Sequence, residues 1–403
     1  MSTQPLPSSF IKKASDIASF YGFRHAQSLD RELPKESRLA ISGSRDADRV
    51  AEACVTCMVS RSQKATAAAA AVAAEKNEKP QQTRAQDAML CYFTNPTPSE
   101  APHGINPRDV AEFGVSIVGS SGSIGEIVAL KTLFSILADS GARVRGVRIG
   151  SGGDRDSQMR FSRELSAYLK KRSADIPDCC SKSMAQDPLS MMRCPGEVCS
   201  KIIDEGPRAM GFLSEKSRSH FREVLEYLER AGMTYELDER LVHDPRMPRV
   251  LFSLDIENED HLIVGARGGR YDDHLRKLSG RKDATVVRAS VFFKKKGLER
   301  SAFTYDDREK RAKIYFVKLG LEASLKSLTV LDSLRKARIP VYQSFSADKL
   351  GPQLSEAERL KVPYLIIMGQ REAMQDAVIV RRVETRSQQM VRLIDLPLYL
   401  KAV

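Results

Sequence analysis

Two apolar segments around a short polar turn constrain the middle of this chain more than any other feature. Residues 250–257 (VLFSLDIE) and 262–265 (LIVG) each suit a buried strand, and residues 258–261 (NEDH) suit the turn between them. Two adjacent glycines, Gly268 and Gly269, follow at the end of the second strand. Glycine at such a place permits positive φ and lets a ligand approach the backbone closely.

Three residues of contrasting chemistry come directly after these glycines. Arg270, Tyr271 and Asp272 supply a cation, an amphipathic ring and an anion on consecutive positions. A tight turn with a solvated arginine and aspartate explains the same residues, because a short glycine-rich match is weak evidence for a ligand site. The choice between a turn and a ligand site therefore depends on the rest of the chain.

The composition indicates a globular protein of several domains. With 403 residues, 42% hydrophobic and 29% charged, the chain is long enough for two or three domains with sizeable cores. No apolar run approaches the roughly 20 residues of a membrane span, so no membrane partner is expected. The first residues lack a basic and then apolar leader, and the odd number of cysteines suits a reducing compartment. We therefore expect a cytoplasmic location.

The charge balance favours a polyanionic partner. The chain carries 64 basic and 52 acidic residues, a formal net charge of +12. The basic residues are spread along the chain rather than gathered in one arm, so a solvated basic surface is the alternative interpretation.

The first three quarters of the chain mix strands and helices. Apolar periodicity predicts helices over residues 10–20, 46–62, 123–139, 159–171 and 221–231, and strands over residues 89–93, 110–119 and 144–149. The helix over 123–139 is predicted to bury one apolar face. Residues 63–86 read as an exposed alanine-rich helix that runs into a polar loop, a low-complexity insertion.

From about residue 312 the pattern changes to regular alternation of strand and helix. Strands are predicted over residues 313–317, 339–342, 362–368 and 377–383, and helices over residues 319–337, 355–361 and 396–401. This spacing is typical of a small α/β domain with a mostly parallel sheet. A basic linker precedes it, so we place one domain at 1–308 and a second at 309–403.

The side chains that could bind metal or phosphate form no standard motif. Cys54 and Cys57 make one C-x-x-C pair without a second pair, and a structural zinc site needs four ligands. Four more cysteines (Cys179, Cys180, Cys194 and Cys199) include no C-x-x-C pair and no neighbouring histidine. We therefore expect no metal site. The loop over residues 119–125 (GSSGSIG) lacks the features of a phosphate-binding loop, and no catalytic residue can be assigned.

In their order along the chain, these segments resemble the histidyl-tRNA synthetase family from end to end. The most specific match is the sequence GGRYD over residues 268–272, which resembles a signature of the histidine pocket. Residues 212–221 resemble the approach to that pocket, residues 112–120 a strand that lines it, and residues 313–401 the anticodon-binding domain. The resemblance implies an α+β fold, with a class II antiparallel-sheet core, flanking helices and a C-terminal anticodon-binding-like α/β domain. It also implies a homodimer that acts in protein biosynthesis and binds tRNA through residues 313–401.

The same resemblance assigns a ligand pocket to seven residues. They are Gly268, Gly269, Arg270, Tyr271, Glu112, Ser116 and Glu100.

Several positions of that pocket depart from the family pattern. Pro98 stands where motif 2 of the family has an arginine for the ATP α-phosphate, two residues before Glu100. The family pairs a glutamine and a glutamate on the substrate imidazole, where this chain has Glu112 and Ser116. The histidine-specific signature is replaced by HDPRMP over residues 243–248, and the motif 3 region keeps only Arg288. Since each lost transition-state contact typically costs roughly 10²–10³ in rate, the combined losses predict that activation is abolished.

We therefore expect a family member that has kept the fold, lost aminoacylation and serves as a tRNA-binding or regulatory paralogue. ATP and Mg²⁺ are expected as cofactors only if ligase activity is retained. An active but divergent histidine–tRNA ligase is one alternative. Another is a protein like the regulatory subunit of ATP phosphoribosyltransferase in histidine biosynthesis. That subunit resembles the core without the last domain, so residues 313–401 argue against it. A scaffold without any small ligand is a further alternative.

Overall fold

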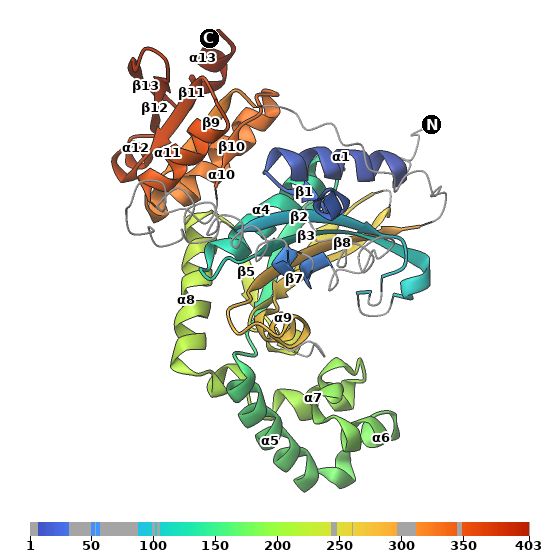
Figure 1. Cartoon of the computed structure of the whole chain (residues 1–403). Coiled ribbons are helices and arrows are strands. Elements are labelled where there is room, and N and C mark those ends of the chain that lie inside the picture. Colours follow the sequence, from blue (N-terminus) through green and yellow to red (C-terminus); the bar gives the residue numbers. More distant parts are fainter. Residues whose placement is uncertain are drawn as a thin grey trace.

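A computed structural model describes most of the chain and divides it into a large sheet body, a helical lobe and a C-terminal domain (Figure 1). The described residues are 7–31, 50–52, 54–56, 88–98, 101–102, 105–242, 248–259, 261–295, 312–344 and 349–402. Within these ranges, no helix is both long and apolar enough to cross a membrane. The predicted insertion over residues 63–86 and the domain boundary near residue 308 lie outside the described residues.

The body contains an eight-stranded sheet with the order β1-β2-β3-β8-β7-β6-β4-β5. Its strands are β1 (Arg24–His25), β2 (Met89–Asn95), β3 (Val110–Val118), β4 (Arg143–Gly150), β5 (Tyr235–Leu237), β6 (Leu251–Glu257), β7 (Ile263–Arg270) and β8 (Val286–Lys294). The short edge pairs β1–β2 and β4–β5 are parallel and all other neighbours are antiparallel. This is the antiparallel α+β core that the sequence predicts.

Helices cover one face of this sheet and form the main core there. α1 (Pro7–Phe20) and α4 (Ile124–Asp139) pack against the sheet and against each other (Figure 1). α4 is buried over more of its surface than the single apolar face that the sequence predicts. Polar residues such as Thr132 and Ser135 are buried together with the apolar ones. Gly141 ends this helix at φ 80°, a backbone conformation in which glycine has no steric penalty.

The opposite face of the sheet carries a second, smaller core. Residues 50–56 lie over it as far as they are described, as does α9 (Asp272–Ser279), which begins where β7 ends. The 3₁₀ helices of the body are η1 (Ala26–Arg31), η2 (Pro107–Asp109) and η6 (Glu239–Val242).

A helical lobe projects from the body at the end opposite the C-terminal domain (Figure 1). It consists of α5 (Arg155–Lys171), η3 (Ser173–Asp175), α6 (Asp178–Gln186), η4 (Pro188–Arg193), α7 (Glu197–Asp204) and η5 (Ala209–Phe212). The long helix α8 (Glu215–Arg230) then returns to the body, beginning at Ser214, whose hydroxyl accepts the N–H of Ser217.

The C-terminal domain contains a five-stranded sheet with the order β10-β9-β11-β12-β13. Its elements are β9 (Ile314–Lys318), α10 (Leu321–Lys336), β10 (Tyr342–Gln343), α11 (Leu350–Arg359), β11 (Tyr364–Met368), α12 (Gln370–Met374), β12 (Ala377–Arg382), β13 (Gln388–Arg392) and α13 (Leu396–Ala402). The expectation of a mostly parallel sheet is wrong, because β11–β12 and β12–β13 are antiparallel. The sequence reading missed β13, so it also missed the hairpin that adds the second antiparallel pair.

The C-terminal domain docks on the body through α10 and α4. The hydroxyl of Tyr21, at the end of α1, lies 2.9 Å from the Ser135 hydroxyl and donates to Asp332 at 3.1 Å. Arg335 pairs with Asp139 at 2.6 Å. Polar side chains at the C-terminal ends of α1 and α4 therefore contact α10.

Candidate functional site

The glycines of the predicted pocket lie inside β7, not in a turn after it. Gly268 pairs with Phe252 and Ala289 in the neighbouring strands, and neither Gly268 nor Gly269 has positive φ. A Cβ on either glycine would collide with a neighbouring backbone carbonyl, that of Arg288 for the first and that of Val250 for the second. Glycine is therefore needed here for close packing of adjacent strands, which replaces the turn interpretation.

Arg270, the last residue of β7, is completely buried and links β7 to α4. Its Nε and one terminal nitrogen donate to the two oxygens of Glu126, each at 2.7 Å. The remaining donors reach the Ser120 carbonyl at 2.9 Å, the Gly122 carbonyl at 2.7 Å and the vicinity of Asp272, at 3.6 Å. Four of the five N–H groups of the guanidinium are therefore hydrogen bonded, and the Asp272 carboxylate balances the charge nearby.

The loop over residues 119–125 therefore presents its backbone oxygens to a cation. Its sequence lacks the features of a phosphate-binding loop. Two carbonyls of this loop accept hydrogen bonds from Arg270, which fixes the loop just before α4 begins.

Glu126 and His220 extend the same buried network to α8. Burial alone would raise the pKa of Glu126, but the charge and hydrogen bonds of Arg270, together with His220, outweigh it and lower this pKa to about 2. His220 Nε2 lies 2.9 Å from the ionised Glu126 carboxylate, so this nitrogen must carry a hydrogen.

The other side of the His220 ring contacts Ser123, at the start of α4. The Ser123 hydroxyl donates to Glu223 at 2.6 Å and lies 3.1 Å from His220 Nδ1. The His220 ring is thus linked to Glu126 directly and to Glu223 through the Ser123 hydroxyl. Tyr227 completes the chain by donating to Glu223 at 2.5 Å.

Three residues of the predicted pocket meet on the second face of the sheet. Ser116 of β3 is the register neighbour of Arg288 in β8, which in turn pairs with Gly269 in β7. The Arg288 guanidinium lies over the Tyr271 ring, 5.2 Å from its centre. The Ser116 hydroxyl is fully buried and forms no hydrogen bond, whereas Tyr271 is buried in the smaller core.

Glu112 lies farther along β3 and has its own partner. Its carboxylate accepts a 2.5 Å hydrogen bond from the Ser290 hydroxyl, and both residues are buried. Beside this pair, the Arg267 guanidinium lies over the Phe292 ring at 5.5 Å. Glu100, the seventh predicted pocket residue, lies outside the described residues.

The structure thus brings part of the predicted site together and separates the rest. Ser116, Gly269 and Tyr271 share one region of the sheet, whereas Arg270 points into the network with α4 and α8. The sequence reading missed Ser290, Glu126, His220 and Glu223. A signal for α8 exists in hindsight, because positions 220, 223 and 227 fall on one face of a helix at helical spacing.

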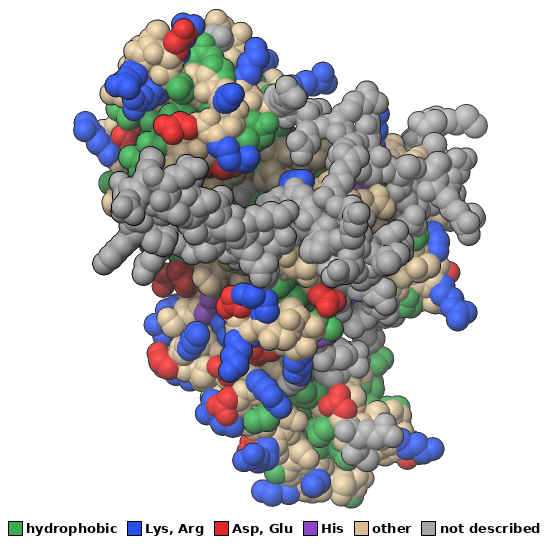
Figure 2. All heavy atoms as spheres, in the orientation of Figure 1, with side chains coloured by type: hydrophobic (Ala, Val, Ile, Leu, Met, Phe, Trp, Pro, Cys, Tyr) green, Lys and Arg blue, Asp and Glu red, His purple; other side chains and the backbone are tan. Residues whose placement is uncertain are grey.

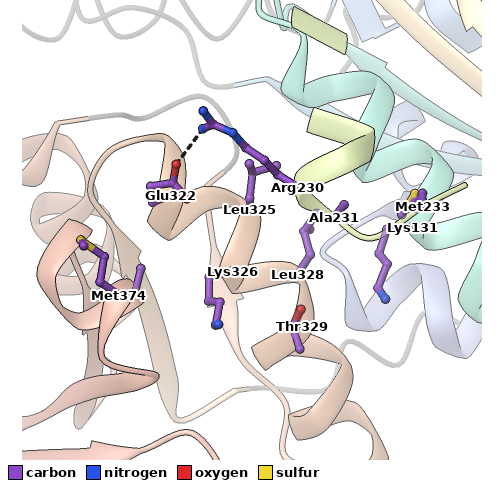
Figure 3. A pocket seen from close by; sticks show the side chains of 11 residues that line it. Lys131, Arg230, Ala231, Met233, Glu322, Leu325, Lys326, Leu328, Thr329 and Met374 are labelled. Carbon is purple, nitrogen blue, oxygen red and sulfur yellow. Dashed lines mark hydrogen bonds and ion pairs between the residues drawn. The ribbon is translucent and has the colours of Figure 1, made fainter. Parts of the chain in front are cut away.

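A separate hollow of about 270 Å³ lies between the body and the C-terminal domain (Figure 3). It is bordered by the end of α8, by α10 and by the end of α12, with Leu325, Leu328 and Met233 among its lining residues. Its charged side chains are engaged with acidic neighbours: Arg230 with Glu322 at 2.6 Å, Lys131 with Asp332 at 3.8 Å, and Lys326 with Asp376. These pairs favour domain docking over ligand binding as the role of this hollow.

Lys and Arg side chains recur on the visible face of the C-terminal domain and on the tip of the helical lobe (Figure 2). They are interspersed with acidic and apolar groups rather than aligned in one stripe, as the spread of basic residues along the sequence predicts.

Several known proteins are similar to this chain in sequence. Residues 313–403 match the family model described as the anticodon binding domain. The histidine–tRNA ligase of Aquifex aeolicus is 26% identical over 298 residues, which cover 74% of this chain and 72% of that protein. The ligase of Bacillus licheniformis is 24% identical over 325 residues, 78% of this chain and 75% of that protein.

Among solved structures, the apo histidyl-tRNA synthetase of S. aureus aligns with 81% of this chain and 79% of its own. It does so at 20% identity and with a TM-score of 0.37, too low to carry weight.

The antiparallel body, followed by an anticodon-binding domain, places the chain among the class II aminoacyl-tRNA synthetase-like proteins. Within that class, the matched relatives span about three quarters of the chain and are histidine–tRNA ligases. The chain is thus similar to the histidyl-tRNA synthetase family over about three quarters of its length. The alternative of an ATP phosphoribosyltransferase regulatory subunit gains no support.

Proposed function

We propose that this chain is a tRNA-binding member of the family that does not activate histidine with ATP. The observation that carries the proposal is the environment of Arg270. Its guanidinium is completely buried, with four N–H groups bonded to Glu126 and to two loop carbonyls and with Asp272 at 3.6 Å, so it is not accessible to a substrate. The best match to the family's histidine pocket therefore stabilises the fold.

The residues at the other pocket positions support the same proposal. An imidazole substrate needs a hydrogen-bond partner placed at its ring nitrogens. The Glu112 carboxylate is buried and bonded to Ser290 through one oxygen, and Ser116 has only a short buried hydroxyl. The sheet face is also filled beside them, since a Cβ at Gly265 would lie 2.7 Å from the Pro102 ring.

The segment at the motif 2 position lacks any cation for a triphosphate. Residues 85–107 contain no lysine and no arginine, and Pro98 stands at the position that we align with the motif 2 arginine. Adenylation builds negative charge on the α-phosphorus, which a bidentate cation stabilises. Arg288 of the motif 3 region lies over Tyr271 instead. ATP and Mg²⁺ are accordingly no part of the proposed activity.

The proposed partner is tRNA, bound through residues 313–401. This part of the chain matches the anticodon binding domain, and residues 313–403 hold 15 Lys and Arg against nine Asp and Glu. We further propose a cytoplasmic homodimer and keep the division into domains 1–308 and 309–403. Gly268, Gly269, Arg270, Tyr271, Glu112, Ser116 and Glu100 then form the remnant of a pocket, not a working active site.

Histidine-dependent ATP–pyrophosphate exchange tests the catalytic half of the proposal. We expect no exchange above the level without histidine, at saturating ATP and Mg²⁺. A bacterial histidine–tRNA ligase assayed in parallel serves as the positive control. Robust exchange by this chain would contradict the proposal and favour the alternative of an active, divergent ligase, which the similarity to ligases over three quarters of the chain supports.

Filter binding or fluorescence anisotropy with a total tRNA pool tests the binding half. We expect binding that weakens steeply with salt, because phosphate contacts release counterions. The absence of binding at low ionic strength would refute a tRNA partner, independently of the exchange assay.

A further inference from the structure

We propose that the helical lobe holds one structural zinc ion through four thiolates, those of Cys179, Cys180, Cys194 and Cys199. Their sulfur atoms all lie within 4.8 Å of one another. The sequence spacing led us to expect no metal here, because it contains no C-x-x-C pair. The fold supplies what the spacing lacks, since two short helices and the turn between them converge.

The separations between the sulfurs fit a tetrahedron around a single metal ion. Zinc–sulfur bonds of about 2.3 Å in tetrahedral geometry place sulfurs about 3.8 Å apart. Cys179 Sγ lies 3.8 Å from Cys180 Sγ, 3.8 Å from Cys194 Sγ and 3.7 Å from Cys199 Sγ. The Cys180 and Cys199 sulfurs lie 3.5 Å apart. Four of the six edges thus lie close to the ideal length.

The local structure orients these sulfurs toward a common centre. Cys179 and Cys180 stand in the first turn of α6, Cys194 directly follows η4, and Cys199 lies in α7. Pro195 and Gly196 connect Cys194 to the start of α7, and the backbone N–H of Gly196 donates to the Cys194 sulfur.

Burial around the cluster varies in a way that suits a structural metal with an entry path. Cys180 and Cys199 are buried, Cys194 is half-buried and Cys179 is exposed. Two thiolates would thus anchor the ion in the core of the lobe, while the exposed side admits it from solvent. With all four positions occupied by sulfur, no coordination site is left for catalysis.

The lobe has a physical need for such a crosslink. It spans residues 155–212 and projects from the body (Figure 1), and its core contains only a small group of buried apolar residues. Short segments with a small core are commonly held by metals or disulfides. One ion bound here would tie α6, the end of η4 and α7 to each other.

Two other forms of four clustered cysteines fit less well. A pair of disulfides requires sulfur separations near 2.05 Å and fixed dihedral geometry, whereas each sulfur here has several neighbours at similar distance. An iron–sulfur cluster divides the four cysteines among two or more irons, which spreads the sulfurs farther apart. A single thiophilic ion with tetrahedral preference, which zinc provides, matches the separations best.

The test is a metal analysis of the full-length, untagged protein purified under reducing conditions without chelator. We expect about one zinc per chain by mass spectrometry of the metal content. Replacement with Co²⁺ should produce the visible bands of tetrahedral cobalt with thiolate ligands, a readout that does not depend on any activity. Iron at the same stoichiometry, or wild-type protein that binds neither Zn²⁺ nor Co²⁺ after complete reduction, would overturn the proposal.

Matched variants separate this site from the other thiols. Cys180→Ser and Cys194→Ser should each lose the bound metal and the cobalt spectrum. Cys54→Ser is the control, because Cys54 is also buried but lies in the body, 3.0 Å from Cys91. It should keep the wild-type stoichiometry. Retention of full zinc and an unchanged cobalt spectrum in Cys194→Ser would contradict the four-thiolate assignment.

Discussion

Replacement of Glu126 by glutamine is the sharpest test of the buried network that we describe. The substitution keeps the shape of the side chain but removes the charge that balances Arg270, both residues being fully buried. A pKa lowered from 4.5 to about 2 corresponds to about 3 kcal/mol of stability at neutral pH, at roughly 1.4 kcal/mol per pKa unit. Removal of one partner of a buried ion pair typically costs about 3–5 kcal/mol of stability. This range agrees with the value from the pKa shift.

The assay is chemical denaturation followed by circular dichroism, since the chain contains no tryptophan. The control is Glu257→Gln. Glu257 also holds an arginine with both oxygens, accepting from Arg145 at 3.0 and 2.8 Å, but this pair is exposed. The two variants therefore differ chiefly in burial, and we expect no resolvable change in the control.

The pH dependence supplies a second readout for Glu126. Its pKa is lower in the folded protein than in the unfolded chain, so its contribution is complete above about pH 4.5. It is lost as the pH falls toward 2. The gap between wild-type protein and Glu126→Gln should therefore narrow over that range. A Glu126→Gln protein as stable as wild type at neutral pH would refute our account of Arg270.

Three further predictions follow from other contacts. Burial lowers the pKa of His25 from 6.5 to about 4, so the stability gained from its neutral imidazole is present above pH 6.5 and lost as the pH falls toward 4. His25→Gln should therefore make the free energy of unfolding less sensitive to acid in a series of denaturation curves, and an unchanged pH profile would contradict this. Arg382 and Arg386 stand exposed at the β12–β13 hairpin, so replacing both by alanine should lower the salt slope of tRNA binding by about two, and an unaltered slope would place the RNA elsewhere. Tyr21→Phe removes the hydroxyl that donates to Asp332, which should lower the free energy of unfolding by about 1 kcal/mol and increase proteolysis at the domain junction. Equal protease resistance would show that this hydrogen bond does not stabilise the contact between the domains.

Most elements of the fold could be predicted from the sequence because they follow from local periodicity. The helices α1, α4, α5 and α8 and the strands β2, β3 and β6 lie within a few residues of their expected ranges. The strand β13 was missed because its sequence, QQMVR, is mostly exposed and polar and has no apolar alternation. Only its pairing with β12 makes it a strand, and pairing is not visible in one segment.

The site was harder to predict because its contacts join distant positions. Arg270 is 144 residues from Glu126 in sequence, and His220 is 94 residues from it. No spacing rule links such positions, so the motif over residues 268–272 suggested a ligand where the fold places a structural cation. For the cysteines of the lobe, in contrast, the sequence predicts no site although the fold brings four thiols together. Their irregular spacing matches no standard metal motif.

The helix α4 has a mechanical consequence for any RNA bound at the far domain. Its 16 residues form a rod of about 24 Å, at 1.5 Å per residue. One end bears Glu126, which holds Arg270, and the other bears Ser135 and Asp139, which hold α10. Because the helix is buried on nearly all sides, it shifts only as a whole between discrete packings. A displacement of the C-terminal domain by bound RNA would therefore move α4. The movement would act on the contact between Glu126 and Arg270, and through Arg270 on the sheet of the body.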